Sequence, residues 1–148
     1  MKSKWIVGGL LSAAVWMFAA PVLADDLPYK EGPVTDVTAV RTKSGKFFEY
    51  WAFLAKDFKA DMDEAKKEGL VVSYSVQAAT PRSPHDPDLY LVVTYPNMAA
   101  FDTLAEKMNA ISKKLRGTTP QQEDKASGDR EAIREILGDQ IIRELQFK

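Results

Sequence analysis

Residues 46–67 carry the clearest alternation of apolar and polar positions in the chain. Their apolar members recur at spacings of three and four, and they are Phe47, Trp51, Leu54, Phe58, Met62 and Ala65. This spacing places them on one side of an α-helix, with Glu49, Lys56 and Asp63 on the opposite side. Ser44 is a suitable N-cap, and Gly69 suits a left-handed C-terminal cap. The pattern predicts a long amphipathic helix that packs on an apolar surface.

Four other segments alternate between apolar and polar residues, as half-buried β-strands do. They are residues 33–41, 70–79, 88–95 and 140–147. In residues 70–79, Tyr74 and Val76 share an apolar face, whereas Ser73 and Ser75 share a more polar one. Residues 88–95 are apolar on both faces, which is typical of a central strand.

Turn residues and apolar spacing predict the structure of the remaining segments. A second helix is expected from Asn97 to about Arg116, where Gly117 would end it. Residues 80–87 contain three prolines and should form a loop. Residues 118–127 are polar and are also expected to form a loop, and residues 129–137 to form a short helix.

The first 24 residues have the pattern of a secretory signal peptide. Lys2 and Lys4 are the only charges before Asp25, and small residues, Val22 and Ala24, follow an apolar run. An uncleaved membrane anchor is the alternative, although the run is short for a span. We therefore expect export to the periplasm or the medium. Residues 25–32 would form a tether before one domain, residues 33–148, with no membrane contact after cleavage.

The composition of the mature chain excludes several kinds of partner and chemistry. Loss of Lys2 and Lys4 takes the formal net charge from −1 to −3, with both signs mixed along the chain. This balance gives no electrostatic footprint for nucleic acid or an anionic membrane. The chain has no Cys, which excludes disulfides, thiol chemistry and lipid attachment through cysteine. Stability must come from packing, which about 124 residues can supply.

The predicted order is strand, helix, strand, strand, helix, short helix, strand. It is the order of the split βαβ or ferredoxin-like fold. We expect an α+β fold with one four-stranded antiparallel sheet and both long helices on one face. Residues 33–41 and 88–95 would be the central strands. The other sheet face would be uncovered, and a second copy of the chain is the simplest cover, so we expect a homodimer through this face.

In this element order, over residues 33–147, the chain resembles the dimeric α/β-barrel superfamily. Two local features carry the resemblance: the turn at residues 43–46, Lys-Ser-Gly-Lys, and the strand Leu-Val-Val-Thr-Tyr at residues 91–95, which leads through Asn97 into the second helix. The resemblance implies two sheets paired into one barrel with the helices outside. It is strongest to exported bacterial members of unknown role. The superfamily includes cofactor-free monooxygenases, haem-degrading enzymes and isomerases, so fold alone does not choose a function.

In that superfamily the ligand cleft lies between the helices and the sheet. By resemblance its lining would include Phe47, Trp51 and Phe58 from the long helix, with Tyr74 and Tyr95 from the strands. Two interpretations stay open. These aromatics are either core residues or the wall of an apolar pocket with a few hydroxyl or indole donors.

The single histidine, His85, lies in the proline-rich loop near Asp86 and Asp88. The spacing of these three residues matches no strong metal signature, so we expect a solvated turn and no metal site. Because His85 is on no predicted helix, it also argues against haem ligation and histidine acid–base chemistry. No phosphate loop or catalytic triad stands out, and we expect no cofactor.

Two charged residues lie on otherwise apolar strand faces. Asp36 shares a face with Val34 and Val40, and Arg143 shares one with Ile141. Because the first and last strands would be neighbours, these charges either pair with each other or lie at the sheet edge or dimer interface.

Three functions remain open from the sequence. The first is an exported protein that binds a small apolar or aromatic molecule in the helix–sheet cleft. The second is a cofactor-independent monooxygenase or isomerase that uses the same cleft. The third is a structural dimer whose cleft is filled by its own side chains. An open cavity with an indole or hydroxyl donor would favour the first two.

Overall fold

The computed structural model describes residues 27–148, so the predicted signal peptide and its cleavage site lie outside the described residues. The elements, in chain order, are β1 (Tyr29–Thr42), α1 (Phe47–Phe53), a π-helical turn (Leu54–Phe58), α2 (Lys59–Lys67), β2 (Ser73–Ala78), β3 (Leu89–Tyr95), a 3-10 helix (Met98–Thr103), α3 (Leu104–Arg116), α4 (Pro120–Asp129), a short 3-10 turn (Arg130–Ala132) and β4 (Arg134–Phe147).

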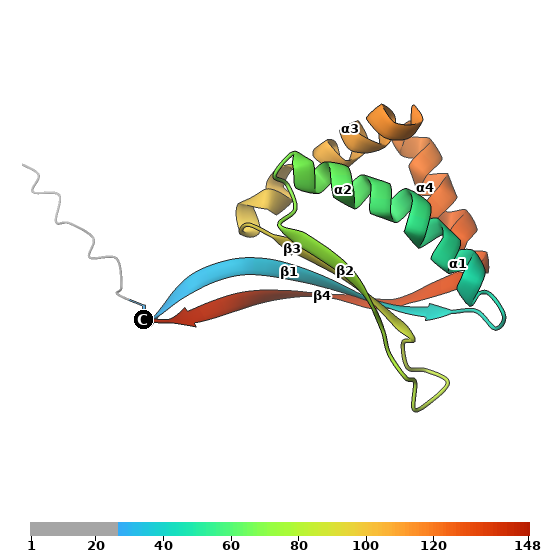
Figure 1. The fold of residues 1–148 in the computed structure, drawn as a ribbon, viewed down its shortest axis with the longest axis horizontal. Coiled ribbons are helices and arrows are strands. Elements are labelled where there is room, and N and C mark those ends of the chain that lie inside the picture. Colours follow the sequence, from blue (N-terminus) through green and yellow to red (C-terminus); the bar gives the residue numbers. More distant parts are fainter. Residues whose placement is uncertain (1–26) are drawn as a thin grey trace, which may run out of the picture.

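One antiparallel sheet, in the order β2-β3-β1-β4, carries all the helices on one face (Figure 1). The predicted ferredoxin-like α+β fold is therefore confirmed, with β1 and β3 in the centre and β2 and β4 at the edges. In the central pair, Val34 lies opposite Tyr95 and Val40 opposite Leu89, and these side chains face the helices. Among the described residues, no helix is long and apolar enough to cross a membrane.

The first strand is longer than its sequence pattern suggests. Residues 29–32, expected in a tether, belong to β1 and pair with the end of β4, where Tyr29 lies opposite Phe147. The β1–β4 pairing is irregular between Glu31 and Val34. Gly32 and Pro33 at this irregularity look like a break in the sequence, because Pro cannot donate to the ladder, but a strand can continue through a bulge. Beyond the helices, β1 and β4 project as a two-stranded ribbon (Figure 1).

The long helix forms as predicted over Phe47 to Lys67, but a π-helical turn interrupts it at Leu54–Phe58. Its buried residues are Tyr50, Leu54, Met62 and Ala65, and the first three are spaced by multiples of four. In a regular α-helix, two residues four positions apart point in directions that differ by about 40° around the helix axis. The wide π turn takes up part of this rotation. Tyr50 therefore occupies the buried face at the start of the helix.

Two clusters of buried side chains fill the space between the helices and the sheet. The larger comprises Met62, Ala65, Leu70, Val71, Val93, Tyr95 and Ile111. The smaller comprises Val40, Tyr50, Leu54 and Leu89, and Phe58 packs against both. Gly69 and Gly117, predicted to end the two long helices, both have positive φ, 74° and 70°. Residues with a Cβ rarely adopt a positive φ, so glycine is favoured at these two helix ends.

The chain after Gly117 differs from the sequence-based prediction. Residues 118–127, expected to be a loop, contain most of α4, and residues 129–137, expected to be a helix, contain the start of β4. Thr119 and Gln122 form a capping box and Pro120 opens α4, so the segment carries a helix start signal although its polar composition favours a loop. The start of β4 is a strand because β1 supplies its ladder hydrogen bonds, beginning with Thr42 opposite Arg134.

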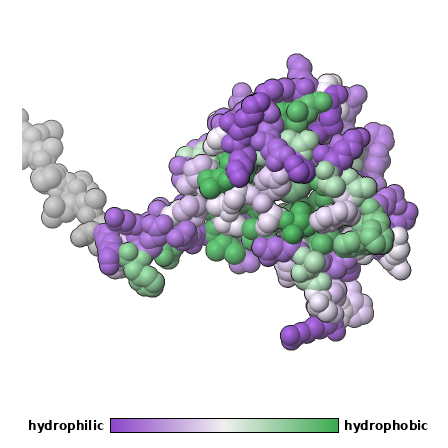
Figure 2. Space-filling view, in the orientation of Figure 1, coloured by the Kyte–Doolittle hydropathy of each residue, from purple (hydrophilic) through white to green (hydrophobic). Residues whose placement is uncertain are grey.

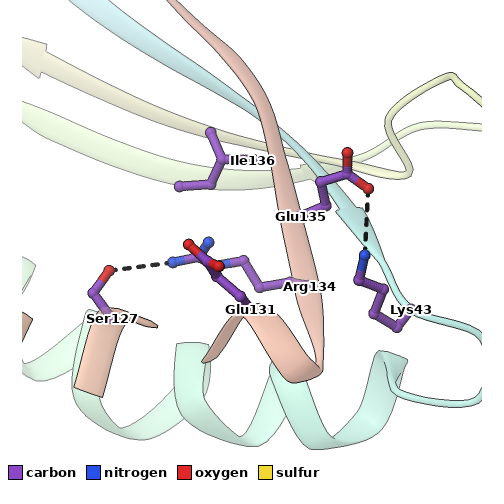
Figure 3. Close-up of a pocket in the computed structure, with 6 residues that line it drawn as sticks. All are labelled: Lys43, Ser127, Glu131, Arg134, Glu135 and Ile136. Carbon is purple, nitrogen blue, oxygen red and sulfur yellow. Dashed lines mark hydrogen bonds and ion pairs between the residues drawn. The ribbon is translucent and has the colours of Figure 1, made fainter. Parts of the chain in front are cut away.

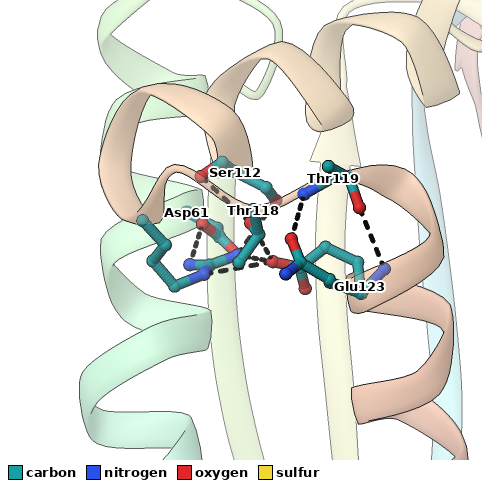
Figure 4. A network of polar contacts seen from close by, with 7 residues as sticks. Asp61, Ser112, Thr118, Thr119 and Glu123 are labelled. Atoms are coloured by element: carbon teal, nitrogen blue, oxygen red, sulfur yellow. Dashed lines mark hydrogen bonds and ion pairs between the residues drawn. The ribbon is translucent and has the colours of Figure 1, made fainter.

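A network of polar side chains attaches α4 to α2 and α3 (Figure 4). The guanidinium of Arg116 donates to both carboxylate oxygens of Asp61, at 2.7 and 3.0 Å, and to Ser112 Oγ at 2.9 Å. It also donates to Glu123 Oε1, at 3.0 and 3.2 Å, and Thr118 donates to the same oxygen at 2.6 Å. One side chain therefore joins three helices.

Candidate functional site

The five aromatics expected in one cleft are divided between the core and the surface. Phe58, Tyr74 and Tyr95 belong to the larger core cluster, where the rings of Phe58 and Tyr74 meet edge to face at 5.9 Å. Phe47 and Trp51 lie outside both clusters at the start of the long helix. Their rings are nearly parallel, with centroids 6.3 Å apart and 7° between the planes. Whether any of the five contacts a ligand stays a prediction.

Phe47 and Trp51 line an apolar hollow of about 280 Å³, which we call the aromatic recess. Its lining residues are Phe47, Phe48, Trp51, Val76, Ala78 and Leu89. Phe47 is 37% exposed, Trp51 44% and Phe48 83%. Apolar surface gathers in the region of α1 in the space-filling view, at the right (Figure 2). The recess thus lies between the first turn of the helix and the edge of the sheet formed by β2.

The local sequence explains why this recess exists. Gly45, with φ of 72°, turns the chain into α1, and Lys46 pairs with Glu49 at 2.7 Å on the first helical turn. Tyr50 occupies the core position at this level of the helix, so Phe47 and Trp51 are left at the rim. Opposite them, β2 ends in the small side chain of Ala78, which leaves the space between helix and strand unfilled.

The lining of the aromatic recess is chemically simple. Among its side chains the only polar group is the indole N–H of Trp51, and none is ionisable. Such a surface can bind a molecule through apolar area and ring stacking, but it supplies no general acid or base. The two tyrosine hydroxyls expected as donors lie elsewhere. Tyr74 donates to Asp63, and Tyr95 is buried, which raises its pKa to about 12 with a smaller contribution from Asp36.

The two charges on apolar strand faces do not pair with each other. Arg143 forms an ion pair with Glu31. Asp36 lies opposite Val93 and Ile141 on the helix side of the sheet, and its Oδ1 is buried without a hydrogen bond in the described part of the chain. Burial, and next the nearby Asp139, raises the pKa of Asp36.

The carboxylates beside His85 are occupied by the chain itself. Asp86 accepts hydrogen bonds from the backbone N–H groups of Arg82 and Ser83, both at 2.9 Å. Asp88 accepts from the backbone N–H of Thr42 at 3.0 Å and from its hydroxyl. Within residues 27–148, no group of three His, Cys, Asp or Glu side chains is placed to hold a metal ion.

A second hollow, which we call the polar pocket, has a volume of about 380 Å³ and lies where α4 leads into β4 (Figure 3). Its lining residues are Lys43, Ser127, Glu131, Arg134, Glu135 and Ile136. Arg134 is buried, whereas Glu135 binds Arg41 at 2.7 Å and Lys43 at 3.4 Å. This pocket has no local signal in the sequence, because the apolar spacing predicts a helix around Arg134 and the other lining residues come from several separate segments.

No protein-family model and no curated protein sequence matches this chain. Two solved structures are similar in shape. HapK from Hahella chejuensis has a TM-score of 0.50 at 13% identity, over 75% of this chain and 91% of that one. Protein SO0527 from Shewanella oneidensis has a TM-score of 0.44 at 20% identity, over 80% of this chain and 96% of that one, a likeness too low to support an argument. The chain therefore shares its ferredoxin-like α+β fold with HapK.

Proposed function

We propose that this protein binds a small apolar or aromatic molecule in the aromatic recess. The observation that carries the proposal is the exposure of Phe47, Phe48 and Trp51 side by side on one turn of α1. Contiguous exposed apolar patches on soluble proteins commonly mark binding sites. Two parallel rings beside an open apolar hollow offer a face on which a planar molecule can stack.

The size and chemistry of the recess define the ligand class. A volume of about 280 Å³ is at the small end of ligand pockets, which suits a molecule of one or two rings. The lining lacks charge, so a neutral ligand is favoured. Apolar burial contributes about 2.5 kcal/mol per 100 Å² before the cost of association. We expect a dissociation constant on the order of 10 to 1000 μM for a single-ring compound.

Binding is proposed in preference to catalysis because no lining side chain of the recess can donate or accept a proton at neutral pH. The cofactor-independent monooxygenase or isomerase would need such a group close to its substrate. Asp36 and Tyr95 could supply one, but they belong to the interior of the sheet and do not line the recess.

We further propose that the mature protein is exported and forms a homodimer. The sequence of residues 1–24 supports export. On the side of the sheet that faces away from the helices, Val37, Tyr90, Val92 and Ile142 form an apolar surface that a second copy would cover. Two sheets would then face each other, with the helices outside.

Intrinsic fluorescence tests the binding proposal directly, because Trp51 is the only tryptophan after residue 24. The mature chain is titrated with benzyl alcohol and, separately, with glycerol. Benzyl alcohol should shift the Trp51 emission to shorter wavelength in a saturable way, because the indole loses contact with water, whereas glycerol should not saturate.

A filled-recess variant gives the matched control. Ala78→Leu should abolish the saturable change, because the added side chain occupies the space that the ligand would take. Ala110→Leu, at an exposed position on α3 outside the recess, should leave it unchanged. Titrations that do not saturate, or that are equal for the two variants, would show that the recess is not a binding site.

A further inference from the structure

Arg134 is the only charged residue that is buried in the described part of the chain, at 6% exposure. It begins β4, opposite Thr42 of β1. Its Nη2 donates to Ser127 Oγ over a long 3.4 Å, and its guanidinium interacts with the buried phenol of Tyr50. No carboxylate within residues 27–148 forms an ion pair with it at 4.0 Å or less. A guanidinium in this position is costly unless an anion neutralises it.

A second arginine lies close by and increases the positive charge. Arg130 stacks on the ring of Phe53, with its Cζ 4.2 Å from the ring centroid. Burial and the positive charge of Arg134 both lower the pKa of Arg130. Two guanidinium groups from one turn of chain are therefore held close enough to repel each other, which an anion between or beside them would relieve.

None of the carboxylates near Arg134 forms an ion pair with it in the described part of the chain. Glu135 binds Arg41 and Lys43, and Asp88 is held by Thr42. Glu131 lines the polar pocket beside Arg134, but it is exposed and forms no ion pair with Arg134 within 4.0 Å. Figure 3 shows the Arg134 side chain directed toward Ser127, with Glu131 beside it, Ile136 above it and Glu135 across the strand toward Lys43.

We propose that the polar pocket binds a small organic carboxylate, with Arg134 as its main partner. The planar guanidinium can hold a carboxylate through two parallel hydrogen bonds, and the Ser127 hydroxyl lies beside it as a further donor. Ile136 supplies an apolar wall for the rest of the molecule. Glu131 and Glu135 on the lining favour a single negative charge over a phosphate dianion.

This site is separate from the aromatic recess and does not depend on the function proposed for it. No residue lines both, and the recess borders β2 whereas the pocket borders β4, at the opposite edge of the sheet.

The test is a titration of the isotope-labelled mature chain with benzoate, acetate and inorganic phosphate at constant ionic strength, followed by NMR. Benzoate should give saturable shifts at the Arg134 side chain, Ser127 and Ile136, with a dissociation constant of about 1 mM. Acetate should bind at the same place but more weakly, because it cannot cover Ile136. Phosphate should be the weakest of the three.

Three variants show whether Arg134 is responsible. Arg134→Lys keeps the charge but loses the paired donors, and should weaken benzoate binding about tenfold or more. Arg143→Lys is the matched control, because Arg143 is on the same strand but pairs with Glu31, and it should change nothing. Glu131→Gln removes an exposed charge from the lining and should tighten binding by about two- to fivefold.

The proposal is overturned by any of three results. They are the absence of saturable benzoate shifts at these residues, equal affinity in wild type and Arg134→Lys, and tighter binding of phosphate than of benzoate. If Arg134→Lys does not fold, Glu131→Gln decides, because an unchanged or weaker benzoate affinity in that variant excludes a carboxylate in the pocket.

Discussion

Arg116→Ala should lower the stability of the protein by removing the side chain that joins α2, α3 and α4 (Figure 4). The substitution leaves Asp61 and Glu123 without their guanidinium partner. Both carboxylates are mostly buried, with side-chain exposures of 17% and 26%, and Arg116 itself is 24% exposed. The change therefore removes several charge-assisted hydrogen bonds from a partly desolvated position.

The magnitude follows from the degree of burial. Breaking a fully buried ion pair costs about 3–5 kcal/mol, whereas exposed pairs contribute about 0.2–1 kcal/mol. The Arg116 network lies between these limits and nearer to the buried one, so we expect a loss of about 2–3 kcal/mol. For a domain of about 120 residues, this corresponds to a decrease in Tm of roughly 6–15 °C.

Urea and thermal unfolding of the mature chain, followed by circular dichroism, measure this loss. Lys125→Ala is the control, because Lys125 and Asp129 form a helix-surface pair at 2.7 Å with exposures of 76% and 65%. It should cost less than about 0.5 kcal/mol. The loss of stability in Arg116→Lys should lie between those of Arg116→Ala and Lys125→Ala, because lysine keeps the charge but not the planar set of donors.

The same network predicts a dependence on pH. The Thr118 hydroxyl, and then Arg116, lower the pKa of Glu123 below its ordinary 4.5, against the opposing effect of burial. A carboxyl whose pKa is lowered by folding stabilises the protein at a pH above its pKa in the unfolded state. This stabilisation is lost as the pH falls through the pKa of the folded state. The cost of Arg116→Ala should therefore shrink in acid below pH 4.5. Equal costs for Arg116→Ala and Lys125→Ala, or a cost unaffected by acid, would refute this reasoning.

Four further outcomes are expected. Asp36→Val should stabilise the protein at neutral pH by about 1–2 kcal/mol in urea unfolding, because it removes a buried acceptor without a partner. Folding raises the pKa of Asp36 above 3.8, so the wild-type protein should lose stability as the pH rises from 3.8 through the pKa of the folded state. If the stability of Asp36→Val depends on pH in the same way over this range, this reasoning is contradicted. Sedimentation should give the mass of a dimer, and Ile142→Glu should convert it to a monomer; a monomeric wild type excludes the sheet-to-sheet pairing. Intact mass of the exported protein should correspond to a chain that starts at Asp25, within a residue, and retention of Met1 would count against a signal peptide. His85→Ala should change the free energy of unfolding by less than about 0.5 kcal/mol, and a larger loss would mean that His85 is not simply a solvated loop residue.

The sequence by itself determined the elements whose signals are local. The apolar spacing over residues 47–67 and the alternation in β3 each depend on neighbours a few positions apart, so both could be identified without the fold. Gly69 and Gly117 likewise ended their helices as predicted, because a left-handed cap needs a residue without a Cβ. The element order then led to the ferredoxin-like sheet, since few topologies accommodate it.

Only the tertiary structure decided which apolar residues are covered and which charges are left without partners. Spacing placed Phe47 and Trp51 on the apolar side of a helix, but the π turn and the end of β2 at Ala78 left them exposed. Arg134 became a buried charge because β4 pairs with β1, a segment more than 90 positions earlier. Local periodicity tells which side chains share a face, whereas burial and charge compensation depend on what distant segments place against that face.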